Sequence, residues 1–254
     1  MLTNVLKQFF LFLFIFFFIC FNSIGQRKKS LIVRERRPYI SFGIGRSVPI
    51  ADKLAVPEDS LSFAKPGIDF VCEATIVFTP FVGFKFSGGG IFNSIDLRAY
   101  EENLKVDLSA RNFLGQYEAR NGGWYTGYYL IGPMFSLPFK KVTFDFDLQA
   151  GATLSYKYPS ELTLYHINGD IEKTKKEKGK GWSLGVSYGL CFRYTLSKKI
   201  ALYTNTKMFL TVPEIKTKVN RVYNGNLVSS ITEKHEQALV HWIVGLGIAY
   251  QVVK

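Results

Sequence analysis

The sequence predicts an all-β fold, an eight-stranded antiparallel up-and-down transmembrane β-barrel with four long external loops and three short periplasmic turns. Three observations predict this fold. The chain begins with a segment that has the layout of an export signal. The remainder alternates apolar and polar residues with period two. The connections between the alternating segments are long and short in strict turn, as in barrels of the outer membrane.

The composition narrows the class of protein. The chain has 254 residues, of which 47% are hydrophobic, 16% aromatic and 20% charged. This balance is too apolar for a disordered chain and too polar for a bundle of membrane helices. Three cysteines are too few for a small disulfide-stapled scaffold. The net charge of +12 fits a protein that binds nucleic acid, one that binds phosphate-bearing lipid, or one whose charge only keeps it soluble.

Residues 1–25 have the order of a secretory signal peptide. Lys7 precedes an unbroken apolar run of 13 residues (9–21), and small residues lie just before the expected cleavage site at Gln26. The alternative is an uncleaved anchor, but the run is shorter than the ~20 apolar residues of a spanning helix. The expected organisation is a signal peptide, a basic periplasmic segment and an outer-membrane barrel domain, at residues 1–25, 26–37 and 38–254.

Alternation of apolar and polar residues marks the strands. The clearest strand is Val142–Lys157, which alternates from end to end without a break. A helix would repeat its apolar residues every three or four positions, so the period excludes one. The eight expected strands cover residues 40–45, 68–78, 82–87, 125–137, 142–157, 182–196, 201–212 and 238–252.

The connections support the barrel. The three short ones are 78–82, 138–141 and 197–199, and the four long ones are 48–66, 96–122, 158–180 and 214–236. An even number of strands with this alternation returns both ends of the sheet to the periplasm. Two long loops contain Asn-Gly between strand-like flanks, at Asn168-Gly169 and Asn224-Gly225. Asn-Gly favours a type I′ turn, so both loops are predicted to be hairpins that extend above the membrane.

The two faces of the strands fit a lipid exterior and a small or polar lumen. Outward aromatic residues gather at two heights, as in the girdles of membrane barrels. Those near the long loops are Tyr125, Tyr129, Tyr156, Trp182 and Trp242, and those near the short turns are Phe78, Phe81, Phe139, Tyr194 and Tyr250. The alternative is a soluble barrel with its apolar face inside, which the strand lengths and the large apolar area disfavour.

Seven charged residues of the expected strands face the lumen. An eight-stranded barrel is filled by side chains and leaves no aqueous channel, so charges inside it must pair. We expect a structural charge network that keeps the strands in register, and the alternative is a gated polar path. The residues are Asp69, Glu73, Lys85, Asp145, Asp147, Arg193 and Lys207.

Short motifs in a characteristic order add a resemblance. They are Phe42-Gly43-Ile44-Gly45 with Pro49, Phe63-Ala64-Lys65-Pro66-Gly67, Phe92-Asn93-Ser94-Ile95-Asp96, Trp124, Gly132-Pro133, and Phe144-Asp145 to Gly151. In this order and spacing the chain resembles an outer-membrane β-barrel family of the Bacteroidota, over most of the mature sequence. The end, Gly247-x-x-Tyr250-x-Val252, is similar to the signal by which a last strand is recognised during assembly. Members of this family are mostly without an assigned activity, so the resemblance implies a location rather than a reaction.

No catalytic, metal or cofactor residues are predicted, and the protein is not expected to be an enzyme. The three histidines, His166, His235 and His241, do not have the spacing of metal ligands. His241 is expected to face the lumen, where it would be the general base of a lipid-modifying enzyme in an alternative interpretation. Cys72 and Cys191 have opposite parity, so they are not expected to form a disulfide.

The external loops are the expected working surface. Five lysines follow the first hairpin, and we expect them to contact lipopolysaccharide phosphates as point charges, with a solvated charge run as the alternative. They are Lys173, Lys175, Lys176, Lys178 and Lys180. The expected role is structural or interaction-based, with outer-membrane lipid and a protein at the loops as partners and no nucleic acid. The alternatives are a narrow pore for small solutes, a lipid-modifying enzyme, and assembly of a secretion system.

Overall fold

A computed structural model describes residues 38–50, 64–110 and 115–252 of the chain. The expected signal peptide and basic periplasmic segment, residues 1–37, lie outside the described residues. Eight long strands form one sheet in the described part. They are β1 (Tyr39–Pro49), β2 (Gly67–Val77), β3 (Val82–Asn93), β5 (Trp124–Phe139), β6 (Val142–Lys157), β9 (Gly179–Thr195), β10 (Ile200–Thr211) and β13 (Leu239–Gln251).

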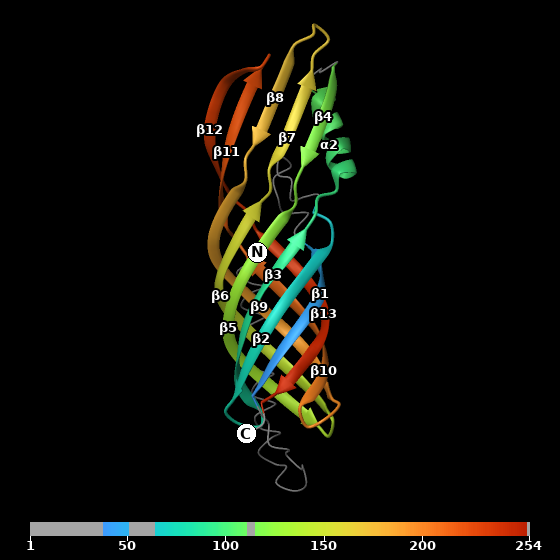
Figure 1. Cartoon of the computed structure of the whole chain (residues 1–254), viewed down its shortest axis with the longest axis vertical. Coiled ribbons are helices and arrows are strands. Elements are labelled where there is room, and N and C mark those ends of the chain that lie inside the picture. The colour runs from blue at the N-terminus through green and yellow to red at the C-terminus, as the bar shows by residue number, and fades with distance from the viewer. Residues whose placement is uncertain (1–37, 51–63, 111–114, 253–254) are drawn as a thin grey trace. The chain divides into compact units, whose positions relative to one another are not determined.

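The eight strands close into an antiparallel barrel, as the sequence predicts. Each strand pairs with its neighbour along the chain, and β1 pairs with β13 from Tyr39 opposite Gln251 to Pro49 opposite His241. Closure satisfies the hydrogen-bonding groups that an edge strand would leave open. Figure 1 shows the strands wound obliquely around the barrel.

Alternation along the strands separates the two faces of the wall. Outward side chains are mainly large and apolar, such as Leu184, which is 81% exposed. Exposed aromatic residues lie at both ends of the wall, with Trp182 at 65% near the external end and Phe78 at 63% beside a short turn. Water does not stabilise such a surface, whereas a bilayer with its interfacial zones does.

The periplasmic turns are short, as expected. β2 and β3 are joined by residues 78–81, β5 and β6 by Lys140 and Lys141, and β9 and β10 by residues 196–199. Lys140 has a left-handed backbone with φ of 51°, which a two-residue hairpin turn requires at that position. No helix in the described part of the chain is long and apolar enough to cross a membrane.

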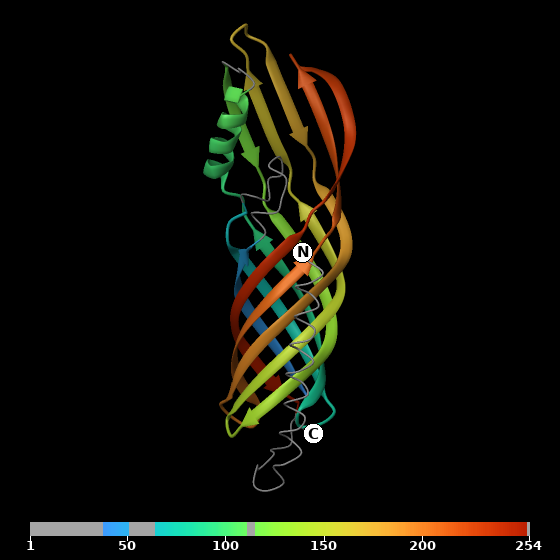
Figure 2. The same ribbon diagram turned by 180° about the vertical axis from the view of Figure 1, so that it is seen from behind.

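The long loops are more ordered than the sequence predicts. Five further strands form a second sheet region, which the pairing orders as β4-β7-β8-β11-β12. We call it the external sheet, and Figures 1 and 2 show it beyond one end of the barrel. Its strands are β4 (Gln116–Asn121), β7 (Ser160–Tyr165), β8 (Ile171–Lys176), β11 (Glu214–Tyr223) and β12 (Asn226–Glu236).

Each strand of the external sheet continues a barrel strand after a two-residue break. The breaks contain Gly122-Gly123 before β5, Pro159 after β6 and Pro213 after β10. Proline has no N–H to donate, but its carbonyl still accepts, so Gly122 N donates to Pro159 O at 3.1 Å and Gln237 N to Pro213 O at 3.1 Å. Backbone hydrogen bonding therefore continues across these breaks.

The two predicted Asn-Gly hairpins form, but only one has the predicted turn. Asn224 and Gly225 have φ of 45° and 82° in a two-residue loop between Tyr223 and Asn226, as a type I′ turn requires. At the other tip only Gly169 has positive φ, and His166 N donates to Asp170 O across a three-residue loop. The type I′ prediction for Asn168-Gly169 was wrong because the loop is one residue longer and places the glycine in a bulge.

A helix that the sequence analysis did not predict lies in the second long loop. This helix, α2 (Leu97–Ala110), follows Asp96, whose carboxylate accepts from Ala99 N at 3.4 Å as an N-cap. The Tyr117 hydroxyl on β4 donates to the carbonyl of Glu101 at 3.2 Å and ties the helix to the sheet. An Asp before apolar residues at helical spacing was the available signal.

Asp170 joins the tips of the two external hairpins. Its carboxylate accepts from Asn224 Nδ2 at 2.7 Å, from Asn168 Nδ2 at 2.6 Å and from the Tyr223 hydroxyl. These hydrogen bonds, that of Tyr223 foremost, lower the pKa of Asp170 below its usual 3.8. A lowered pKa means that the contact is complete above the ordinary value and is lost as the pH falls through the lowered one.

Replacing Asp170 by alanine should therefore loosen the contact between the two hairpin tips, which hydrogen bonds between Ile171 and Asn224 still join, and leave the barrel closed. Amides 168–171 and 223–226 should be less protected in hydrogen–deuterium exchange at pH 7. Wild-type amides should lose the same protection, relative to the intrinsic exchange rate at each pH, only in strong acid. Glu236→Ala, an exposed carboxylate on β12, is the control. Equal protection of the tips in all three proteins would contradict the proposed link.

Candidate functional site

The lumen contains the seven charged residues predicted to face it, and the structure groups them by ion pairs. Nearest the short turns, Arg193 lies 3.0 Å from the carboxylate of Asp145, with both side chains buried. The guanidinium also stacks over Tyr39, 4.0 Å from the ring centroid. Ser136 donates to Asp145 from the neighbouring strand. This group crosses the barrel, since it joins residues of β1, β5, β6 and β9.

The second group is centred on Lys85. Its ammonium lies 3.0 Å from Glu73 and 3.0 Å from Asp147, and all three side chains are buried. Ser41 donates to the other oxygen of Glu73 at 3.1 Å. One cation of β3 thus neutralises two carboxylates, one on the neighbouring strand β2 and one on β6, which lies two strands away on the other side. The ion pairs therefore join side chains of three strands inside the lumen.

The third group is Lys207 with Asp69 and Tyr128. Lys207 lies 3.2 Å from Asp69 and donates to the Tyr128 hydroxyl at 2.8 Å, and that hydroxyl donates to Asp69 at 2.8 Å. Lys207 and Asp69 come from β10 and β2, which are separated in the wall by β13 and β1. The side chains therefore span the lumen rather than line its wall.

An apolar layer also crosses the lumen, contrary to the expectation of a small or polar interior. Tyr128 and Phe209 are each 1% exposed, and their ring centroids lie 5.4 Å apart. The rest of the buried cluster is Val71, Ile91, Leu130 and Ile243. Because the interior of an eight-stranded barrel is filled by side chains, bulky residues have to occupy it as well as charges. Tyr128 and Leu130, which interrupt the alternation of their strand, were the available signal.

Ser47 and His241 form a pair that sequence reasoning did not find. Ser47 Oγ lies 3.0 Å from His241 Nδ1, on β1 and β13, and both side chains are buried. A serine beside a histidine is the start of a nucleophilic triad. A buried hydroxyl is closed to a lipid substrate, however, and Phe209 lies over the histidine with centroids 6.2 Å apart. The geometry favours a structural hydrogen bond between β1 and β13, the two strands that close the barrel, over a catalytic pair.

The predicted lysine run is divided among different surroundings. Lys173 pairs with Glu161 at 2.7 Å, and Lys176 with Glu233 at 3.6 Å. Lys178 lies over the ring of Tyr156, 4.3 Å from its centroid. Lys175 and Lys180 are exposed. The five residues do not form one surface, because alternate residues of β8 point to opposite faces of the external sheet.

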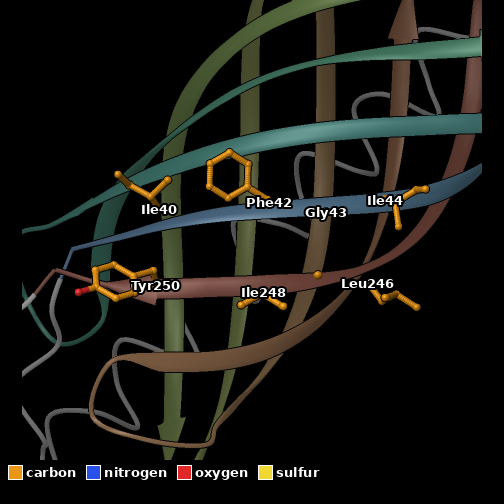
Figure 3. A pocket seen from close by; sticks show the side chains of 8 residues that line it. Ile40, Phe42, Gly43, Ile44, Leu246, Ile248 and Tyr250 are labelled. Atoms are coloured by element: carbon orange, nitrogen blue, oxygen red, sulfur yellow. The ribbon is translucent and has the colours of Figure 1, made fainter.

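Other candidate groups lie apart from the lumen. Cys72 is exposed on the outer wall and Cys191 is buried inside, so they lie on opposite sides of the wall as predicted. No group of three or more His, Cys, Asp or Glu residues suited to a metal ion occurs among the described residues. A shallow apolar groove runs along the outer wall at the β1–β13 seam, between Ile40, Phe42 and Ile44 on one side and Leu246, Ile248 and Tyr250 on the other (Figure 3).

The apolar belt between two aromatic girdles identifies the membrane in which this wall lies. Closed antiparallel barrels with short turns at one end and long loops at the other span the bacterial outer membrane. The protein is therefore an outer-membrane β-barrel.

Comparisons with known proteins find matches among solved structures alone, and these are of low similarity. No protein-family model and no curated protein matches the chain. Among solved structures, it is similar to the attachment invasion locus protein Ail of Yersinia pestis, with 10% identity, 85% of this chain and 99% of that chain covered, and a TM-score of 0.41.

A major outer membrane protein of Thermus thermophilus matches with 11% identity, 85% and 99% coverage, and a TM-score of 0.40. The outer membrane protease OmpT of Escherichia coli matches with 9% identity, 89% and 99% coverage, and a TM-score of 0.33. Likeness at this level carries no argument about activity.

Replacing Lys85 by methionine should destabilise the barrel by about 3–5 kcal/mol, because Glu73 and Asp147 would remain buried without their cation. Unfolding by guanidinium in detergent micelles measures the change. Lys199→Met, an exposed lysine in a periplasmic turn, is the control for loss of charge.

Neutralising the carboxylates as well, in Lys85→Met with Glu73→Gln and Asp147→Asn, should recover much of the lost stability. A Lys85→Met protein as stable as the Lys199→Met control would show that the buried cation does not hold the lumen together.

Proposed function

We propose that the protein is a barrel sealed across its lumen that holds the external sheet above the membrane as a surface for a protein partner. The observation that carries this proposal is the occupied lumen. Three ion-paired groups and a buried apolar cluster fill the lumen, and side chains from non-adjacent strands meet within them. The proposal includes no catalytic step.

A sealed lumen makes a pore the weaker candidate. A path for a small polar solute has to be continuous and hydrated, whereas Tyr128 and Phe209 meet inside this barrel, toward its external end. Moving a polar solute through such a layer would remove it from water without replacing its hydrogen bonds. The buried charges serve to neutralise one another, and we propose that their role is to keep the strands in register.

The external sheet has the features of a binding surface. Ile167, Leu227 and Val228 at its hairpin tips are 75%, 63% and 68% exposed. These tips lie at the far end of strands that begin where the lipid-facing wall ends, so lipid does not cover them. Strand β12 pairs only with β11 among the described strands and presents one open edge. Open edges and exposed apolar tips are both means by which sheets bind proteins.

The family of the protein and its export are also part of the proposal. The ordered motifs from Phe42-Gly43-Ile44-Gly45 to Gly151 support membership of the Bacteroidota outer-membrane barrel family. A protein of the outer membrane has to be exported from the cytoplasm. An export signal at residues 1–25 would direct this step, and the apolar run before Gln26 supports such a signal.

Planar-bilayer conductance tests the seal. The purified full-length protein should give no single-channel steps, and the Tyr128→Ala, Phe209→Ala double variant should give them, because it removes the two rings that meet in the lumen. Tyr129→Ala is the matched control, since Tyr129 is the next residue of β5 and faces lipid. Steps of equal size in the wild type and the double variant would contradict a sealed lumen.

Labelling of intact cells tests the direction of the external sheet. A Val228→Cys variant should react with a membrane-impermeant maleimide, and a Lys199→Cys variant should react only after the outer membrane is opened. Cys72 on the lipid face and Cys191 inside the lumen should contribute little background. Labelling of Lys199→Cys alone in intact cells would invert the proposed orientation.

A further inference from the structure

Three lysines from different strands lie side by side at the base of the external sheet. Lys180 on β9 is directly opposite Lys216 on β11, and Lys216 is directly opposite Lys234 on β12. All three are exposed. Residues directly opposite in antiparallel strands have Cβ atoms about 5 Å apart and share one face of the sheet. We call these residues, together with Lys178, the lysine row.

The charge of the lysine row is only partly neutralised within the protein. Glu214 lies 3.8 Å from Lys216 and 4.0 Å from Lys234, and both distances are at the limit of an ion pair. Glu236 is opposite Glu214 at the start of the same strand pair, and Glu177 pairs with Lys218. No carboxylate within the described residues pairs with Lys178 or Lys180.

Like charges directly opposite one another destabilise a pair of strands. Three lysines in register on adjoining strands therefore have a physical cost, which an anion bound between them would remove. Packing does not require three lysines to be opposite one another, because these side chains lie on an exposed face of the sheet. The cost points to a ligand with negative charge on that face.

The residues between the lysine row and the lipid-facing wall indicate where that anion comes from. Lys180 precedes Trp182 on the outward face of β9 by two residues, about 7 Å along the strand. Lys180 is also opposite Tyr156, whose ring carries the ammonium of Lys178 at 4.3 Å. Trp and Tyr of a girdle lie at the level of lipid headgroups. The row therefore lies directly above the acyl chains, where headgroup phosphates are.

We propose that Lys178, Lys180, Lys216 and Lys234 bind the phosphate groups on the sugar headgroup of outer-leaflet lipopolysaccharide. This inference rests on the proposed outward direction of the external sheet. It also differs from the set of five lysines between residues 173 and 180 expected from the sequence, because Lys173 and Lys176 have closer carboxylate partners than Lys216 and Lys234 have. Lysine suits this ligand, since it binds phosphate as a mobile point charge.

Binding of purified lipid A to the detergent-solubilised full-length protein tests the proposal, with native mass spectrometry as the readout. The probes are lipid A with its phosphates, dephosphorylated lipid A and inorganic phosphate. The row variant carries Lys→Gln at 178, 180, 216 and 234. The control variant carries Lys→Gln at 140, 141, 198 and 199, which are exposed in the periplasmic turns, so it has the same net charge.

The wild type and the control variant should bind phosphorylated lipid A about 100-fold more tightly than the row variant, which corresponds to about 0.7 kcal/mol per lysine. Dephosphorylated lipid A should bind all three proteins equally weakly. Without lipid, the row variant should melt at or above the wild-type temperature because its like charges are gone, and phosphorylated lipid A should raise the melting temperature of the wild type but not of the row variant.

Two results would overturn the inference: equal binding by the row and control variants, or equal binding of lipid A with and without phosphates. Full competition by inorganic phosphate at an equal concentration would replace the lipid by free phosphate as the ligand. Conductance of the row variant and the labelling of Val228→Cys separate this failure from failure of the proposed function, since neither depends on the lysine row.

Discussion

The antiparallel seam between β1 and β13 is the contact on which the rest of the molecule depends. A membrane offers no water to an open strand edge, so the first and last strands have to pair along their length. Gly43 is opposite Gly247 and Gly45 is opposite Gly245 in this seam. Tyr203 fills the space inside them, and a Cβ on Gly43 would lie 2.2 Å from its hydroxyl. The small residues therefore allow a large ring into the lumen at the point where the wall closes.

Closure with only eight strands determines the character of the interior. The bore is too narrow for bulk water, so the inward charged side chains have to find partners among the other residues of the lumen. The charged residues do so in three groups that each join non-adjacent strands, and the aromatic and branched residues form a buried cluster that shares Tyr128 with one of these groups. Sealing and strand register are thus two consequences of one geometric constraint. The external sheet is an extension of the same wall, because paired strands that leave the membrane can continue as a sheet and need no additional hydrophobic core.

Much of this fold is predictable from local pattern. The eight strands, the three short turns, the lipid face and the lumen position of Lys85 and Arg193 follow from parity, because period two leaves no choice of face once the strand is known. Parity does not determine which inward residues meet, since partners such as Asp69 and Lys207 lie far apart in the chain. Parity also did not reveal α2. Its apolar residues recur at helical spacing over only a short segment, which the barrel pattern assigns to a long loop.

The sequence by itself determined the class, the strand order, the two faces of the wall and the presence of charges that must pair. The tertiary structure decided which charges pair, that Tyr128 and Phe209 complete the seal, and that Lys180, Lys216 and Lys234 lie in one row. The reason is the same in each case. Alternation is a local property of the chain, whereas the stagger between strands is set by closure of the whole barrel, and the stagger alone brings distant residues level with one another.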